Sequence, residues 1–131
     1  TNVMIGKNDP NVIAILDWEL STLGDPCADF NYHCLQYIMN PKLADKDYCR
    51  NQGIPVIDEY VKMYSEKINV DLTEEWDLYS AYNLFKLAGI LQGILGRVRD
   101  GTAAHENAAE RASGVRNLSD KAWDLVKKNF L

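Results

Sequence analysis

The sequence predicts a mainly α-helical protein with a short β-hairpin at its N-terminus. Two runs rich in β-branched residues, 3–5 and 12–16, are separated by the turn-forming residues 6–11. From residue 25 onward, apolar residues instead recur at helical spacing between capping and breaking residues. We therefore expect residues 1–131 to form a single domain, with the hairpin in residues 1–18 and helices in residues 25–131.

The predicted hairpin has little polar surface, because both of its strands are apolar almost throughout. An isolated two-stranded hairpin is only marginally stable in water. We therefore expect it to lean on the helices or on a partner segment outside this sequence. Where its apolar surface stays exposed, it would favour self-association with another copy of the chain.

The first helix has clear signals at both ends. Asp25 can cap a helix whose first residue is Pro26, where the missing N–H of proline does no harm. The sequence Asn40-Pro41 should end it. Its apolar stripe is formed by Cys27, Phe30, Cys34 and the pair Tyr37 and Ile38. Residues 41–53 read as a loop with dispersed charges, and a second helix should start at Pro55, with Ile57, Tyr60, Val61 and Tyr64 on one face.

The longest helix should run from about residue 74 to residue 98, with Thr73 as its N-cap. Apolar residues lie on nearly all of its faces, which is typical of the central helix of a bundle. It also contains Gly89, Gly93 and Gly96, each costing about 1 kcal/mol relative to alanine, so we expect a neighbouring helix to approach closely there.

The remaining residues should form two further helices. Asp100-Gly101 should end the long helix, and Thr102 should cap an alanine-rich helix that runs to about Ser113. Gly114 separates or kinks it from a last helix. That last helix should bury Leu118, Ala122, Leu125 and Phe130.

Composition excludes several classes of partner. A net charge of −5, with the basic residues dispersed, argues against nucleic acid, because an acidic surface repels phosphate backbones. We expect no membrane span, since no apolar run approaches the roughly 20 residues that one needs. The three cysteines lack the paired spacing of a disulfide framework or a zinc site. We therefore expect a reducing compartment, namely the cytoplasm, or an organelle matrix in a eukaryote.

Asp17 is the first candidate for chemistry, because it follows directly on the apolar run 12–16. On its spacing alone it is equally well explained as a strand terminator. A hairpin that turns at residues 7–11 would, however, place Asn2 beside it. A carboxylate and a carboxamide at one point suit Mg²⁺, which takes oxygen ligands and is commonly held by one or two protein groups plus phosphates.

Three motifs carry a resemblance to a known family. Asn2 matches the last residue of the pattern H-G-D-x-x-x-x-N, residues 16–19 read L-D-W-E, and residues 24–29 read G-D-P-C-A-D. Together they resemble the aminoglycoside phosphotransferase and choline kinase family of small-molecule kinases. The form of the motifs, with 53–55 and 88–93, is most similar to the branch associated with acyl-CoA dehydrogenases. The resemblance implies the helical C-terminal lobe of a protein-kinase-like (α+β) fold.

The resemblance also implies roles for individual residues. Asn2 and Asp17 would bind Mg²⁺, and Met4 and Leu16 would form the apolar floor beneath the adenine of ATP, unless they are ordinary hairpin core. Asp29 would lie under the catalytic loop and accept hydrogen bonds from its backbone, unless it serves only the helix dipole. Glu19 would lie near metal-bound water, or be a solvated loop acid.

The resemblance is incomplete in ways that bear on activity. The His and the catalytic Asp of H-G-D should lie just before Thr1, and the glycine-rich loop and phosphate-binding Lys belong to an N-terminal lobe. No general base is therefore expected in these 131 residues, and we expect this fragment alone to be inactive and to bind neither ATP nor Mg²⁺.

Two classes of function stay open. The complete protein would be an ATP- and Mg²⁺-dependent kinase acting on the hydroxyl of a small molecule, with a hydroxyacyl-CoA as the candidate acceptor. The acceptor cleft would involve the face 76–83 and the loop 41–53. Alternatively, the chain is a non-catalytic helical interaction module derived from such a kinase, in which the metal ligands are relics.

Overall fold

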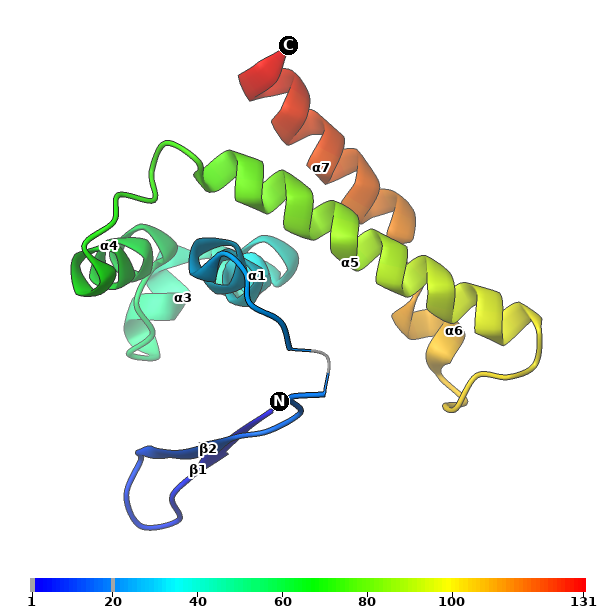
Figure 1. Ribbon diagram of the computed structural model, residues 1–131, viewed down its shortest axis with the longest axis horizontal. Helices are drawn as coiled ribbons and strands as arrows, with labels where there is room; N and C mark the ends of the chain where they lie inside the picture. Colours follow the sequence, from blue (N-terminus) through cyan, green and yellow to red (C-terminus); the bar gives the residue numbers. More distant parts are fainter. Residues whose placement is uncertain (1, 20) are drawn as a thin grey trace.

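The computed structural model describes residues 2–19 and 21–131, except for the side chain of Arg111; Thr1, the first residue of the predicted hairpin, and Leu20 lie outside the described residues. The predicted fold class is confirmed, because the chain is mostly helical and begins with a two-stranded antiparallel hairpin (Figure 1). Its elements are β1 (Val3–Ile5), β2 (Val12–Ile15), α1 (Pro26–Met39), α2 (Pro41–Ala44), α3 (Lys46–Asn51), α4 (Ile57–Ile68), α5 (Trp76–Arg99), α6 (Ala108–Arg111) and α7 (Val115–Phe130).

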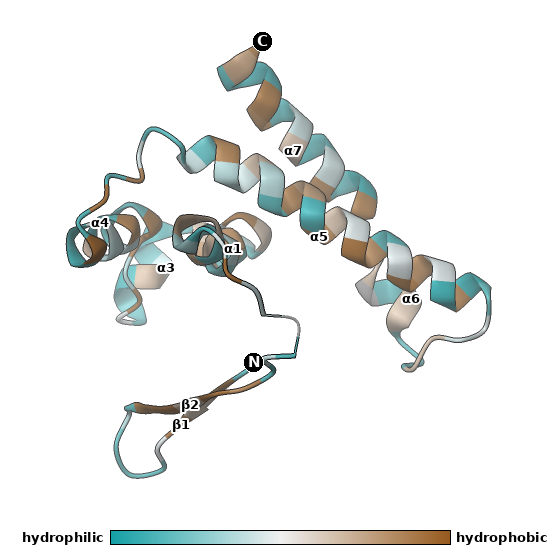
Figure 2. Ribbon diagram, viewed as in Figure 1, coloured by the Kyte–Doolittle hydropathy of each residue, from teal (hydrophilic) through white to brown (hydrophobic). Residues whose placement is uncertain are grey.

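The hairpin projects away from the helices (Figure 1). Val3 pairs with Ile15 and Met4 with Ala14, and the register shifts between Met4 and Ile5. Its apolar strands stand out in Figure 2. Within the described part of the chain, the large apolar side chains of the hairpin stay exposed, namely Val3, Met4, Ile5, Val12, Ile13, Ile15 and Leu16.

Helix α1 has the predicted start and end. The Asp25 carboxylate caps it by accepting a hydrogen bond of 2.8 Å from the backbone N–H of Cys27, and Asn40 ends it before Pro41. The predicted stripe of Cys27, Phe30 and Cys34 is buried. Asp25 and Pro26 therefore determine where the first helix begins, and its apolar stripe determines which face of the helix is buried.

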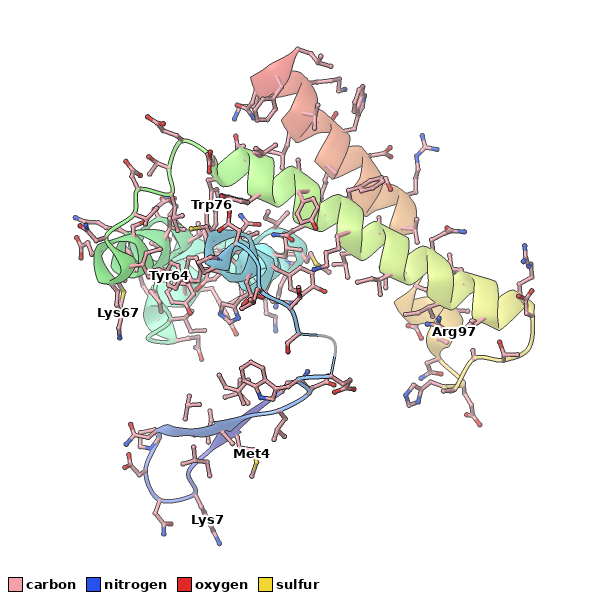
Figure 3. The ribbon with its side chains drawn as sticks, viewed as in Figure 1. Met4, Lys7, Tyr64, Lys67, Trp76 and Arg97 are labelled. Carbon is pink, nitrogen blue, oxygen red and sulfur yellow. The ribbon has the colours of Figure 1, made fainter. Side chains whose placement is uncertain are left out.

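Two apolar clusters flank α1. The first lies between α1, α4 and the segment before α5, where the ring of Tyr64 stacks on that of Phe30 with a centroid distance of 3.8 Å. Figure 3 shows Tyr64 and Trp76 close together in this region. The second cluster lies between α1, α5 and α7 and contains Leu35, Leu84, Ala88, Leu118 and Ala122.

Helix α5 is central, as its apolar pattern predicts, since it packs against α1, α6 and α7. Among the described residues, no helix is both long enough and apolar enough to cross a bilayer.

The last helix, α7, buries Leu118 and Ala122 as predicted, and Leu125 is half-buried. Phe130 is exposed in this structure, contrary to the prediction, because in the last turn of α7 its neighbour Asn129 makes the contact with α5, through Asp77.

The segment 41–53 is not a loop, and that prediction was wrong. It contains α2 and α3, which are each capped by a side chain. Asn40 Oδ1 accepts from the backbone N–H of Lys42, and Asp45 Oδ1 accepts from Asp47 and Tyr48. Such short helices show no apolar periodicity, so only their caps reveal them. Helix α4 also begins at Ile57, two residues beyond the predicted Pro55.

Neither predicted threonine cap was correct. Thr73 bonds to the Asp71 carboxylate through both its N–H and its hydroxyl, and α5 begins later, at Trp76. The N–H of Thr102 donates to Arg97 O and that of Gly101 to Val98 O, the pattern of a Schellman motif. Thr102 therefore closes the end of α5, and the alanine-rich segment is helical only at 108–111.

The three glycines of α5 do not mark a close helix contact, contrary to the prediction. Among the described residues, a Cβ added to Gly89 or Gly96 would have no heavy atom of another part of the chain within 4 Å. One added to Gly93 would meet only the Arg97 side chain, at 3.9 Å. The contact with α7 is instead carried by Leu84 and Ala88, on another face of α5.

Candidate functional site

The hairpin brings Asn2 and Asp17 together. Leu16 N donates to Asn2 O at 2.8 Å, which extends the strand pairing to the end of the hairpin. The Nδ2 of Asn2 then donates to Oδ2 of Asp17 at 2.7 Å, and the two residues are fifteen positions apart in the chain. The juxtaposition that the sequence predicts from a turn at residues 7–11 is therefore present.

Asp17 has an unusual backbone conformation. Its φ of 69° lies in the left-handed region, which costs most residues about 1–2 kcal/mol and which Asn and Asp enter more readily than others. The chain turns sharply here, and Trp18 Nε1 donates back to Ile15 O at 2.6 Å. Ser21 secures the loop by donating to Trp18 O. Backbone strain of this kind is concentrated at functional sites.

The donor set of this pair fits Mg²⁺. The Asp17 carboxylate supplies anionic oxygen, and the Asn2 carboxamide supplies a neutral oxygen once a half-turn presents Oδ1 in place of Nδ2. Both residues are exposed, so phosphates and water can complete the coordination. Mg²⁺ typically uses one or two protein oxygens in this way. The pair is therefore chemically suited to a metal–nucleotide complex.

Met4 and Leu16 lie on the same face of the hairpin as the Asn2 side chain. Asn2 is opposite Leu16, and Met4 is opposite Ala14, and directly paired residues share a face. Met4 is 46% exposed and Leu16 is 48% exposed, so neither is hairpin core in this structure. In Figure 3 the Met4 side chain points away from the helices. Both side chains are thus accessible to an apolar ring.

The sequence also singles out two other acids, Glu19 and Asp29. Glu19 is exposed in the loop after Asp17. Asp29 is exposed in the first turn of α1, and its N–H donates to Asp25 O at 3.3 Å. Asp29 lines a cavity, which we call the polar cavity, of about 420 Å³.

The polar cavity lies between the loop after Asp17, the start of α1 and one face of α5. Its lining residues include Trp18, Asp29, Tyr32, Tyr82, Asn83 and Lys86. Tyr82 and Asn83 belong to the face 76–83 that the sequence indicates for an acceptor, whereas residues 41–53 do not line this cavity. Trp18 follows Asp17 directly, so the cavity borders the loop after Asp17, although neither Asn2 nor Asp17 lines it.

Sequence reasoning missed Lys86 and Tyr32, which both line the polar cavity. The Nζ of Lys86 lies 5.2 Å from the centroid of the Tyr32 ring. Helical spacing was the available signal, since Lys86 is four residues after Tyr82, and Tyr32 is three residues after Asp29. The cavity thus combines aromatic walls with two carboxylates, of Asp25 and Asp29, and the ammonium group of Lys86.

A hydrogen bond to Tyr79 fixes the carboxylate of Asp25 at the edge of the polar cavity. The Tyr79 hydroxyl donates to Asp25 Oδ2 at 2.6 Å and also contacts Glu75 Oε2 at 2.9 Å. This hydrogen bond, together with the one from Cys27 N, holds the pKa of Asp25 below its usual value. The same two carboxylates raise the pKa of Tyr79. Asp25 is thus kept ionised as a cap that ties α1 to α5.

The phosphotransferase enzyme family matches residues 1–82, a range that includes Asn2, Asp17 and Asp29. The chain belongs to this family. It is 35% identical, over 97% of its length, to acyl-CoA dehydrogenase family member 10 of Mus musculus. It is 32% identical to family member 11 of Homo sapiens over 98% of its length, and 33% identical to the probable acyl-CoA dehydrogenase IBR3 of Arabidopsis thaliana over 96%.

The chain spans only a small part of these relatives, namely 12% of the mouse protein, 17% of the human protein and 16% of the Arabidopsis protein. No solved structure matches it. The family membership that the motifs indicate is therefore shown, and so is the similarity to proteins named as acyl-CoA dehydrogenases. The matched part is too small for the activity of these relatives to be assigned to this chain.

Proposed function

We propose that this chain carries the metal ligands of an ATP- and Mg²⁺-dependent small-molecule kinase, which transfers a phosphoryl group to a substrate hydroxyl. Membership of the phosphotransferase family supports the reaction class. The observation that carries the proposal is the contact between Asn2 and Asp17, at the end of a hairpin whose apolar face is accessible.

Each residue has a role in this proposal. Asn2 and Asp17 hold Mg²⁺, which when bound neutralises the charge of the phosphates. Met4 and Leu16 pack beneath the adenine. The left-handed turn at Asp17 and the hydrogen bond from Trp18 keep the carboxylate at the end of the hairpin, so that little reorganisation precedes metal binding. Asp29 supports the catalytic loop of the complete protein.

A hydroxyacyl-CoA is the acceptor that we propose. The relatives are named as acyl-CoA dehydrogenases, which associates this family branch with acyl thioesters. A kinase that acts on a hydroxylated member of the same class would be a natural partner for that chemistry. The polar cavity offers a place for the reacting end, since Trp18 lines it and follows Asp17.

We expect the 131 residues alone to transfer no phosphate. They contain no His-Gly-Asp sequence and no glycine-rich phosphate loop, which supply the base and the phosphate contacts in kinases of this fold. The complete protein would supply both. ATP-dependent phosphorylation of a hydroxyacyl-CoA by the purified chain would contradict this expectation.

The test is the substitution Asp17→Asn in the complete protein, assayed for phosphate transfer from ATP with Mg²⁺ present. We expect activity to fall by at least about 100-fold, the size of effect seen when a charge-stabilising group is removed. The control is Asp9→Asn, which neutralises a carboxylate in the turn of the same hairpin, where Asp9 accepts from Asn11. Unchanged melting temperatures would show that both variants fold, and an active Asp17→Asn protein would refute the metal assignment.

The exposed hairpin favours a second candidate function, a non-catalytic interaction module. Its apolar strands present a surface that a partner or a second copy could cover. Nucleotide binding by the complete protein separates the two candidates. Calorimetric titration with ATP and Mg²⁺ should show binding that Asp17→Asn weakens if the chain is part of a kinase, and none if it is only a module.

A further inference from the structure

A second cavity, the apolar groove, runs between α5 and α7. It has a volume of about 440 Å³, and its lining residues include Leu78, Tyr82, Phe85, Ala122, Trp123 and Val126. Ser119 also contributes, but its hydroxyl already donates to Val115 O at 3.0 Å within α7. The groove therefore presents hydrocarbon and aromatic surface almost exclusively.

Large side chains of this groove are exposed to water in the described structure. Phe85 is 71% exposed and Trp123 is 55% exposed, and Leu78 is also exposed. Aromatic residues grouped in this way on a surface mark a binding site more often than scattered apolar residues do. At about 440 Å³, the groove also falls within the size range of small-molecule sites, roughly 300–1,000 Å³.

Tyr82 connects the apolar groove to the polar cavity, because it lines both. Asn83 and Lys86 on one side of it face the polar cavity, whereas Leu78 and Phe85 on the other side face the groove. The two cavities thus occupy adjacent faces of α5. One cavity places the charged groups of Asp29 and Lys86 beside aromatic rings, whereas the other is lined almost only by apolar groups.

We propose that the two cavities form one acceptor site, in which the apolar groove binds the hydrocarbon tail of the hydroxylated acceptor. The proposal rests on the proposed function and adds a tail-binding subsite to it. The polar end of the acceptor lies in the polar cavity beside Trp18, and the tail passes Tyr82 to lie against Phe85 and Trp123. Continuity through Tyr82 favours one amphipathic molecule over a separate partner, which would need only the groove.

The first test measures phosphorylation by the complete protein of straight-chain hydroxyacyl-CoA thioesters of increasing length. Each methylene buried in the groove should lower KM about fourfold, the factor that corresponds to about 0.8 kcal/mol of transfer free energy. The substitution Phe85→Glu places a charge in the groove and should abolish this dependence on length. Ile90→Glu is the matched control, since Ile90 is also an exposed apolar residue of α5 but lines neither cavity. Its dependence on length should equal that of the wild type.

The second test needs no catalysis. An acyl-CoA with a photoreactive diazirine at the end of its tail is irradiated with the complete protein, and the labelled residues are mapped by mass spectrometry. We expect labelling within 78–85 and 119–126 that is lost in Phe85→Glu and kept in Ile90→Glu.

The outcomes separate this inference from the proposed function. Phosphorylation with a KM that does not depend on chain length would overturn the tail subsite and leave the kinase proposal standing. Labelling of the groove without phosphorylation of any acceptor would support a tail-binding groove and overturn the kinase proposal. A groove covered by another segment of the complete protein would give no labelling there, and this would also overturn the assignment.

Discussion

Asn83 on α5 donates a hydrogen bond of 3.0 Å from its Nδ2 to the Oδ1 of Asn31 on α1, and each residue is only 1% exposed. The same amide of Asn83 donates to Ala28 O at 2.8 Å, and Asn31 donates to the hydroxyl of Ser80 at 2.9 Å. These buried polar groups are thus paired across two helices that are far apart in the chain. The network fixes α5 against α1 beneath the polar cavity.

Replacing Asn83 by alanine should destabilise the chain by about 2 kcal/mol, because it leaves the buried Oδ1 of Asn31 without its donor. Urea unfolding monitored by circular dichroism measures this change. The control is Asn129→Ala, which removes an exposed bond to Asp77 and should change the free energy of unfolding by no more than about 0.5 kcal/mol. Equal losses of unfolding free energy in the two variants would mean that burial does not increase the contribution of the Asn83 hydrogen bonds to stability.

The contact between Asn83 and Asn31 shows where sequence reasoning stops. Asn83 is buried on α5, but its partner lies 52 residues away in the sequence, on another helix. Local patterns specify faces and caps, as Asp25 and Pro26 do for α1. They do not specify which helices pair, and very short helices such as α2 and α3 carry no periodic signal at all.

The candidate site was more predictable than the packing, for a physical reason. The turn at residues 7–11 determines the pairing of the two strands, so the closeness of Asn2 and Asp17 follows from local sequence. The left-handed conformation of Asp17 could not be read in the same way, because most aspartates have negative φ. Lys86 and Tyr32 were missed because their meeting depends on how α5 packs on α1.

The glycines of α5 provide a test of the helix itself. An added Cβ at Gly89 or Gly96 meets no described heavy atom of another part of the chain within 4 Å, so alanine there should stabilise the chain by about 1 kcal/mol through helix propensity. Gly101→Ala should instead destabilise it by about 1 kcal/mol, because Gly101 has a φ of 71° at the end of the same helix. Urea midpoints of the three variants measure both effects. A loss of stability in Gly89→Ala would instead indicate that a neighbouring helix approaches Gly89 closely, as the sequence predicts.

The three cysteines should react slowly with thiol reagents in the folded chain. All three are buried free thiols, and burial raises the pKa of Cys34 to about 12, so almost none of it is thiolate at neutral pH. Labelling with iodoacetamide at pH 7.5, followed by mass spectrometry, should modify Cys34 at least about 100-fold more slowly than in urea. Rapid labelling of Cys34 in native buffer would show that the cluster between α1 and α4 opens readily.

The hydrogen bond from Tyr79 to Asp25 should make stability depend on pH at the acid end. The pKa of Asp25 is lower in the folded chain than its ordinary value of 3.8, first because Tyr79 donates to it. The stabilisation that ionised Asp25 gives the folded chain is therefore present above pH 3.8 and is lost as the pH falls through the lower, folded pKa. Tyr79 has a raised pKa, so its own contribution is present below pH 10 and is lost as the pH rises through the folded value.

Tyr79→Phe removes this hydrogen bond, and its cost in the free energy of unfolding should therefore be constant between pH 5 and pH 9 and shrink below pH 4. Urea unfolding of both proteins at a series of pH values measures that difference. Tyr37→Phe is the matched control, because the Tyr37 hydroxyl donates to a neutral group, Pro55 O, at 2.8 Å. The cost of this control substitution should stay flat through the acid range, since a carbonyl does not titrate. If Tyr79→Phe gave the same flat profile, the Tyr79 hydroxyl would gain nothing from an ionised carboxylate, and the role assigned to its bond with Asp25 would be wrong.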